Sequence, residues 1–203
     1  MTCKLSRETI SNVINFHGHS CPGLSIGIRV SELARRELGD LPDARLVCIT
    51  ETDMCGVDAV QYLTGCTYGK GNLIHRDYGK TAFTFFDRET GRGFRCLFRS
   101  GARGGMAGEM SSLQKKIASG EANETEQARC KELRRQMEEG LMDSDLDQLF
   151  EVMQPNVAMP RNARILASLV CEACGEETME SRTRRFAGQT LCQPCFNKVE
   201  QKV

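Results

Sequence analysis

Two short cysteine pairs constrain the fold of this 203-residue chain more than any other feature of its sequence. The first pair reads Cys171-Glu172-Ala173-Cys174 and the second, seventeen residues further on, reads Cys192-Gln193-Pro194-Cys195. Each pair folds into a tight knuckle that aims two sulfurs at one point, and zinc accepts four thiolates at tetrahedral corners. The spacing therefore predicts a structural zinc site with Cys171, Cys174, Cys192 and Cys195 as its ligands.

The residues around these cysteines predict a small treble-clef or zinc-ribbon domain over 161–203. A strand over 165–170 leads into the first knuckle, Gly175 and Gly188 suit sharp turns, and 196–203 has helical composition. Four protein ligands would close the metal to substrate. Because about forty residues bury too little apolar surface alone, the zinc should supply folding energy. The alternatives, two disulfides or a redox dithiol pair, fit this spacing less well.

The composition limits the class of protein and its compartment. The chain has 11 cysteines, an odd number, and those outside the two pairs are irregularly spaced, which favours a reducing compartment over a disulfide framework. Lys and Arg total 27, as do Asp and Glu, which argues against a general nucleic-acid or membrane-surface binder. Neither a long apolar run nor an apolar signal core is present, so we expect a cytoplasmic protein without membrane association.

Hydrophobic periodicity and turn residues predict an α+β domain over 1–103. A capped helix is expected from Ser6 to Gly18, and a largely buried one from Pro22 to Gly39. The remaining expected elements are a strand over 46–49, a helix over 57–63 ending at Gly65, a strand over 73–74, and a hairpin of strands over 82–86 and 94–98. Helices and strands in this order indicate an α+β class.

A helical arm is predicted over 104–160. The glycine-rich segment 100–105 forms a flexible joint, and three charged, helix-favouring stretches follow over 106–117, 124–139 and 143–153. Their apolar stripes are narrow, so we expect the arm to pack on a partner subunit or on the first domain. The alternative is a solvated spacer, because charged runs are usually exposed faces.

A second group of soft ligands lies in the first domain. His17, His19 and Cys21 fall within five residues before a helix, Cys55 precedes another helix, and Cys66 lies in a third loop. The positive N-terminal end of a helix favours a thiolate, which makes these cysteines candidate ligands or nucleophiles. If the loops meet, one imidazole with Cys21 and Cys55 would form a mixed site with an open fourth position, suited to zinc or another transition metal.

Several of these residues have structural alternatives. His17 could instead cap the preceding helix, and Cys66 could be a buried loop thiol. Five other residues are not expected to bind metal: Cys48 and Cys96 as core thiols, His75 as a packed or hydrogen-bonded strand residue, and Cys3 and Cys130 as incidental positions. The glycine-rich turns 69–72 and 77–80 each carry a lysine and could hold an anion, but surface turns are the simpler interpretation.

The first hundred or so residues resemble the E-subunit family of formylmethanofuran dehydrogenase. The resemblance rests on Phe16-His17-Gly18-His19-Ser20-Cys21-Pro22-Gly23, on Cys55 with Asp58-Ala59-Val60-Gln61, on Thr64-Gly65-Cys66-Thr67-Tyr68-Gly69-Lys70-Gly71-Asn72, and on Gly79-Lys80-Thr81-Ala82-Phe83. It implies an α+β fold with a mixed sheet, similar in shape to the catalytic domain of glyceraldehyde-phosphate dehydrogenase, a metal on the His/Cys loops, and a homodimer. Residues from 106 onward lie outside it, and the last part resembles the zinc finger of DksA/TraR-type regulators.

Three hypotheses about function follow. The family is named for a complex that reduces carbon dioxide to a formyl group, so the resemblance implies a zinc-binding accessory of an oxidoreductase or C1-transfer complex, or a binder of a small anionic ligand. The first alternative is a stand-alone enzyme, with Cys55 as nucleophile or an open zinc as Lewis acid and Asp53 or Asp58 carrying protons. The second is a regulator that contacts nucleic acid through Arg182, Arg184 and Arg185, which the balanced charge disfavours.

Overall fold

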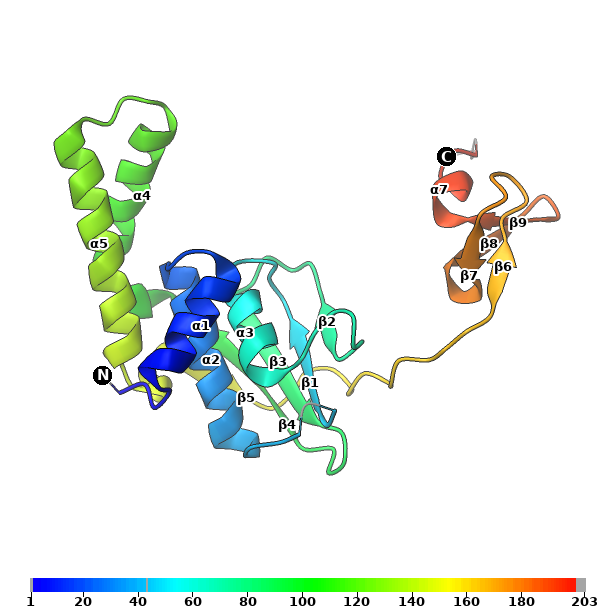
Figure 1. The fold of residues 1–203 in the computed structure, drawn as a ribbon, viewed down its shortest axis with the longest axis horizontal. Coiled ribbons are helices and arrows are strands. Elements are labelled where there is room, and N and C mark those ends of the chain that lie inside the picture. Colours follow the sequence, from blue (N-terminus) through cyan, green and yellow to red (C-terminus); the bar gives the residue numbers. More distant parts are fainter. Residues whose placement is uncertain (1, 43, 200–203) are drawn as a thin grey trace. The chain divides into compact units, whose positions relative to one another are not determined.

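A five-stranded mixed sheet organises the first of two units into which the chain divides, Met1–Asn162, while the second unit is Ala163–Val203 (Figure 1). The computed structural model describes residues 2–42 and 44–199. The strand order is β2 (Leu73–His75), β1 (Leu46–Thr50), β3 (Ala82–Asp87), β4 (Gly93–Phe98) and β5 (Phe150–Met153). β1 and β2 are parallel and the other neighbours are antiparallel. The α+β class with a mixed sheet is confirmed.

The three helices of the first domain begin and end where their capping residues predict. α1 (Arg7–His17) starts at Ser6, whose side chain accepts a hydrogen bond from the Thr9 N–H, and ends at Gly18 with φ +92°. α2 (Pro22–Leu38) has proline at its first position, and α3 (Gly56–Thr64) ends at Gly65 in the left-handed conformation. Every residue of α2 from Leu24 to Ala34 is buried, so α2 is the central helix of this unit.

Helices α2 and α3 cross with their backbones in direct contact. A Cβ atom on Gly27 of α2 would lie 2.1 Å from the carbonyl oxygen of Gly56, the first residue of α3. A Cβ on Gly56 would in turn lie 2.9 Å from the carbonyl oxygen of Gly23. Only glycine allows this approach, which places the N-terminal ends of both helices side by side. The crossing therefore positions Cys21 and Cys55, the residues that precede the two helices.

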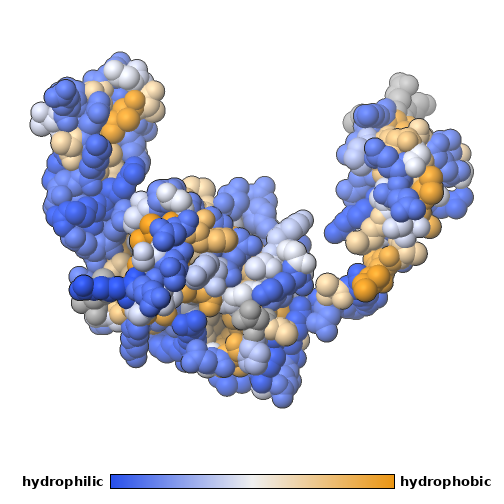
Figure 2. All heavy atoms as spheres, viewed as in Figure 1, coloured by the Kyte–Doolittle hydropathy of each residue, from blue (hydrophilic) through white to orange (hydrophobic). Residues whose placement is uncertain are grey.

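The predicted arm is a helical hairpin of α4 (Met106–Ala118) and α5 (Glu124–Asp143), with a short 3₁₀ helix η1 (Ser100–Arg103) at its base. Its buried seam consists of Met110, Leu113, Cys130, Leu133 and Met137. Cys130, expected to be incidental, is thus a packing residue of the arm. Hydrophilic side chains cover most of the viewed face of the hairpin, as its narrow apolar stripes predict (Figure 2).

The C-terminal end of α5 packs on the first domain of the same chain. Leu141 and Met142 are buried in the clusters beneath α2, and the Met142 carbonyl accepts a hydrogen bond of 3.2 Å from the Cys3 N–H. The Arg29 guanidinium, which is 1% exposed, donates to the Ser144 carbonyl at 2.7 Å. The alternative of a solvated spacer is therefore wrong. Cys3, also expected to be incidental, belongs to one of these buried clusters.

The stretch 143–153 is not the third arm helix that its composition predicts. It forms a single turn, α6 (Leu146–Leu149), followed by strand β5, which pairs with β4 in the register Phe98 to Phe150. The rings of these two phenylalanines are 5.9 Å apart. Sheet pairing and the burial of Phe150 outweigh the helical propensity of the surrounding residues. The sheet thus includes residues far beyond 103.

The second unit contains two small hairpins. β6 (Ser168–Val170) pairs with β7 (Glu177–Met179), and after the 3₁₀ turn η2 (Glu180–Arg182), β8 (Thr183–Phe186) pairs with β9 (Gln189–Cys192) through a turn at Gly188. The helix expected over 196–203 is instead one turn, α7 (Gln193–Phe196). It begins at the second knuckle because Pro194 suits a first helical turn. Residues 200–203 of that prediction lie outside the described residues. Within the described chain, no helix is long and apolar enough to cross a membrane.

Candidate metal centres

The four cysteines of the second unit converge on one point. The sulfurs of Cys171, Cys174, Cys192 and Cys195, called here the four-cysteine cluster, all lie within 4.8 Å of one another. The Cys192 N–H donates to the Cys171 sulfur at 3.2 Å, and the Cys174 and Cys192 sulfurs are 3.9 Å apart. The turn of the first hairpin supplies one pair, and the end of β9 with the helical turn α7 supplies the other, so the ligands are held by local structure. The cluster fits zinc binding.

The electrostatics of this cluster also suit a cation. Backbone N–H groups of Cys192, Cys174 and Ala173 donate to the Cys171 sulfur and lower the pKa of that thiol to about 6. The neighbouring thiols of Cys192 and Cys174 raise the pKa of Cys195 to about 12. The four sulfurs therefore cannot all be thiolates without a compensating positive charge, which a divalent zinc ion supplies.

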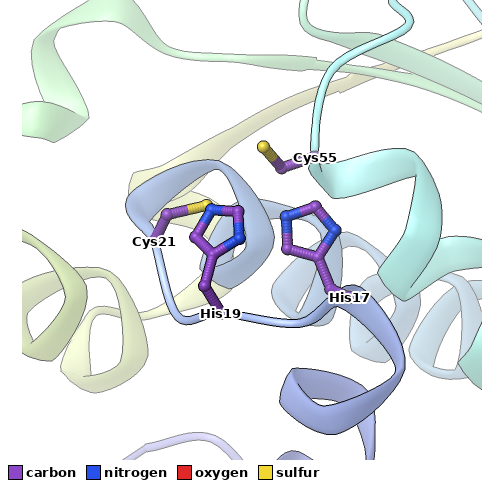
Figure 3. A group of neighbouring side chains, drawn as sticks. All are labelled: His17, His19, Cys21 and Cys55. Atoms are coloured by element: carbon purple, nitrogen blue, oxygen red, sulfur yellow. The ribbon is translucent and has the colours of Figure 1, made fainter.

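A second group of donors comes together in the first unit. The imidazoles of His17 and His19 and the thiols of Cys21 and Cys55, called here the His/Cys cluster, each offer a donor atom within 4.8 Å of the others. Figure 3 shows both rings and both sulfurs gathered about one space. The last residue of α1 and the loop that follows it carry three of the donors, and Cys55, just before α3, is the fourth. Four side chains, rather than the three expected, meet here.

His17 shows that this arrangement fits a metal ion. Its Nδ1 atom lies 2.7 Å from an oxygen of Asp58, while its Nε2 atom is buried and has no hydrogen-bond partner among the described residues. The side chain is 10% exposed. A carboxylate on one nitrogen and an unpaired second nitrogen are typical of a metal-binding histidine. The alternative role as a helix cap is taken by the Gly18 N–H, which donates to the Ile14 carbonyl.

Cys21 does not have the thiolate character expected from its place at a helix start. Burial raises the pKa of its thiol, and the nearby Cys55 thiol raises it further. The opposing effect is the Leu24 N–H, which donates to the Cys21 sulfur at 3.3 Å. Desolvation therefore outweighs the helix N-terminus in the metal-free protein. A bound cation would reverse this balance by stabilising the thiolate.

Cys66 is not brought to the His/Cys cluster. It is fully buried in the main core, where its thiol donates to the Leu46 carbonyl at 3.4 Å. Cys48 and Cys96 are also fully buried, which confirms them as core thiols. His75, at the end of edge strand β2, is exposed rather than packed, so the expected packing is wrong. Cys66 is therefore not one of the proposed ligands.

A cavity of about 350 Å³ opens beside the His/Cys cluster. Three of the four donors line it, namely His19, Cys21 and Cys55. The facing wall is built by η1, α4 and α5 and includes Arg103, Met110, Ser111, Gln114, Arg134 and Met137. His19 is the exposed member of the cluster. No motif in the sequence indicates the arm side of this cavity, because that wall depends on how the hairpin packs on the first domain.

Two family models match the chain. The model described as "FmdE, Molybdenum formylmethanofuran dehydrogenase operon" matches residues 16–151. The model described as "Prokaryotic dksA/traR C4-type zinc finger" matches residues 164–201. The first match runs through the arm helices and β5, so the resemblance extends well past residue 106. It covers the His/Cys cluster and all walls of the cavity.

Two individual proteins are also similar to this chain. A protein of Archaeoglobus fulgidus named "Probable S-adenosyl-L-methionine-binding protein" is 31% identical over 188 residues, which cover 89% of this chain and 50% of that protein. The chain thus spans about half the length of this curated relative. A solved structure of a protein from Syntrophus aciditrophicus, described as similar to the E subunit (FmdE) of tungsten formylmethanofuran dehydrogenase, is 25% identical. Its TM-score is 0.56 over 93% of this chain and 90% of that chain.

Proposed function

This chain belongs to the FmdE family, and on that premise we propose that its first unit binds a transition metal at the His/Cys cluster and presents it to a small ligand. The second unit carries a four-cysteine zinc finger that stabilises its own fold. The protein would then act as a metal-dependent small-molecule-binding accessory in redox or C1 metabolism. The name of the Archaeoglobus fulgidus relative favours small-molecule binding over a regulatory role.

The observation that carries this proposal is the buried, unpaired Nε2 atom of His17. A buried imidazole nitrogen without a partner is costly, and a metal ion at the centre of the cluster would satisfy it. Two imidazoles and two thiols form a borderline-soft donor set that suits zinc. His17, His19, Cys21 and Cys55 would hold the ion, and Asp58 would fix the His17 ring and increase its basicity.

Metal content of the full chain tests the proposal. We expect two zinc ions per chain by elemental analysis. Changing Cys171 and Cys174 together to serine should remove one of them, and changing His17 to Gln together with Cys55 to Ser should remove the other. One zinc per chain in the unchanged protein, insensitive to the second pair of substitutions, would overturn the metal site in the first unit.

An enzyme with an open metal position is the second candidate, favoured by the exposure of His19. If His19 does not bind the metal, three ligands would remain and a water molecule could take the fourth place, where its pKa would fall. Asp58 is then engaged in holding His17 and Asp53 is exposed, so neither has the free, buried position that suits a proton carrier. X-ray absorption at the zinc edge separates two imidazoles with two sulfurs from one imidazole, two sulfurs and water.

Homodimer formation and attachment to an oxidoreductase complex also belong to this proposal. The descriptions of the matching family and of the solved relative both refer to formylmethanofuran dehydrogenase, which supports the attachment to such a complex. Light scattering of the metal-loaded chain would test the dimer, with a mass twice that of the 22.6 kDa chain expected. A monomeric mass at micromolar concentration would count against it.

A further inference from the structure

The cavity beside the His/Cys cluster carries positive charge that the protein itself does not neutralise. Arg103 and Arg134 line it, and among the described residues neither forms an ion pair. Their neighbours differ in this respect. Arg129 and Arg135 lie on the same helix as Arg134, and both are paired with glutamates of α4 or α5. Within the part of the chain that the structure describes, no acidic side chain lines the cavity.

Both arginines are exposed, and a ring contact orients one of them. The Arg103 guanidinium lies 5.4 Å from the centre of the Phe98 ring, a cation–π contact that orients it. The N-terminal end of α4 adds to the positive field, because Gly105 provides no side-chain cap and Ala107 of the first turn lines the cavity. These groups therefore bring positive charge to the same cavity that His19, Cys21 and Cys55 line.

The remaining walls indicate what is attached to the anion. Met110, Met137 and Pro22 present apolar surface, and methionine adapts to ligands of varied shape. Ser111 and Gln114 add neutral hydrogen-bonding groups. A volume of about 350 Å³ is at the lower end of the range, roughly 300–1,000 Å³, that small-molecule sites occupy. The cavity suits a compact molecule with one anionic end and an apolar body.

We propose that this cavity binds a small molecule whose carboxylate or phosphate group lies between Arg103 and Arg134 and whose body lies against Met110 and Met137. The inference rests on the proposed function, because it places that molecule beside the proposed metal. Carboxylates and phosphates both accept paired hydrogen bonds from guanidinium groups. The structure therefore indicates an anionic group, and the experiment below distinguishes a carboxylate from a phosphate.

Calorimetric titration of the metal-loaded full chain with 3-mercaptopropionate tests this inference. The thiol can anchor the probe to the metal by displacing His19, the exposed member of the cluster, and 3-mercaptopropionamide is a neutral control of the same length. We expect the acid to bind at least about tenfold more tightly than the amide, since hydrogen bonds to charged groups are the stronger ones. Changing Arg103 and Arg134 together to Gln should abolish that preference. Lys131→Gln, which removes one exposed charge of α5 outside the cavity, should preserve it.

Competition then identifies the anion. If inorganic phosphate weakens probe binding at a lower concentration than acetate does, the anionic group of the ligand is a phosphate ester. If acetate acts at the lower concentration, the group is a carboxylate. Equal binding of acid and amide, or an acid preference that survives in the double arginine variant, would overturn the proposal. Zinc content is measured on the same samples before and after titration. If the chain held one zinc but the acid preference still depended on the arginines, the proposed metal site would fail and the anion site would stand.

Discussion

The two metal centres of this protein are built in opposite ways. The four-cysteine cluster draws its ligands from two hairpins within 25 residues of chain, and the second unit has only a small core of Cys171, Leu191 and Cys192 around them. The His/Cys cluster draws its ligands from the end of α1, the loop after it and the residue before α3, which a helix crossing brings together over a large independent core. The first kind of site makes its own fold, whereas the second depends on a fold that already exists.

Removing a metal ligand should therefore have the largest effect in the second unit. We expect Cys171→Ser to unfold residues 163–203 and leave the first unit folded, because structural zinc contributes about 10–16 kcal/mol to modules of this kind. Hydrogen exchange followed by mass spectrometry would show the loss of protection in one unit only. Cys55→Ser is the matched change, and it should remove one zinc while both units stay protected. Global unfolding by Cys55→Ser would break the comparison.

Separating helices α2 and α3 should have the next largest effect. Gly27→Ala forces a methyl group against the Gly56 carbonyl, where only 2.1 Å is available. We expect the first unit to lose about 1–3 kcal/mol of stability, measured by urea denaturation, and to lose metal affinity as Cys21 and Cys55 move apart. Gly108→Ala is the control, since a Cβ there meets no atom of the described residues within 4 Å and helix propensity improves. Equal effects of the two substitutions would argue against the crossing as the positioning element.

Loosening one ligand should have a smaller effect. Asp58→Asn keeps the shape of the side chain but removes the charge that holds the His17 ring. We expect the zinc affinity of the first unit to fall by about 10- to 100-fold, measured by competition with a chromophoric chelator, with little change in stability. Asp53→Asn, at an exposed position, should leave the affinity unchanged. An unchanged affinity for Asp58→Asn would mean that His17 is not a ligand.

Lowering the pH should have the smallest effect, and the two units should respond at different pH values. The Arg95 guanidinium donates two hydrogen bonds to the buried Glu51 carboxylate and lowers its pKa. The lowered pKa means that this pair stabilises the first unit above the ordinary Glu pKa of about 4.3, and that the contribution is lost as the pH falls toward the folded-state value. As the pH falls, the second unit should lose its zinc before the first unit loses this stabilisation, because the thiolates that bind the zinc take up protons first. Circular dichroism and zinc release between pH 7 and 3 would check this order, and Glu51→Gln should flatten the acid dependence of the first unit.

Local signals in the sequence predicted local structure well. Ser6, Pro22 and Gly65 mark helix boundaries through their own backbone preferences, and the four-cysteine spacing specifies a knuckle without reference to the rest of the chain. Strand β5 was missed because its stability comes from pairing with β4, more than fifty residues earlier. The distinction between Cys66 and Cys55 has the same cause. Both lie in loops near helix ends, and only the tertiary packing directs one to the core and the other to the cluster.

The arm is inserted between neighbouring strands of one sheet. β4 leads into it through η1, and β5 returns the chain to the edge of β4, so both ends of the excursion are anchored side by side. Of the hairpin, the cavity uses only the part nearest this anchor, up to Gln114 on α4 and from Arg134 on α5. The distal turns are therefore free of the pocket, and we expect that whole turns could be deleted or added there without disturbing either the strands or the cavity.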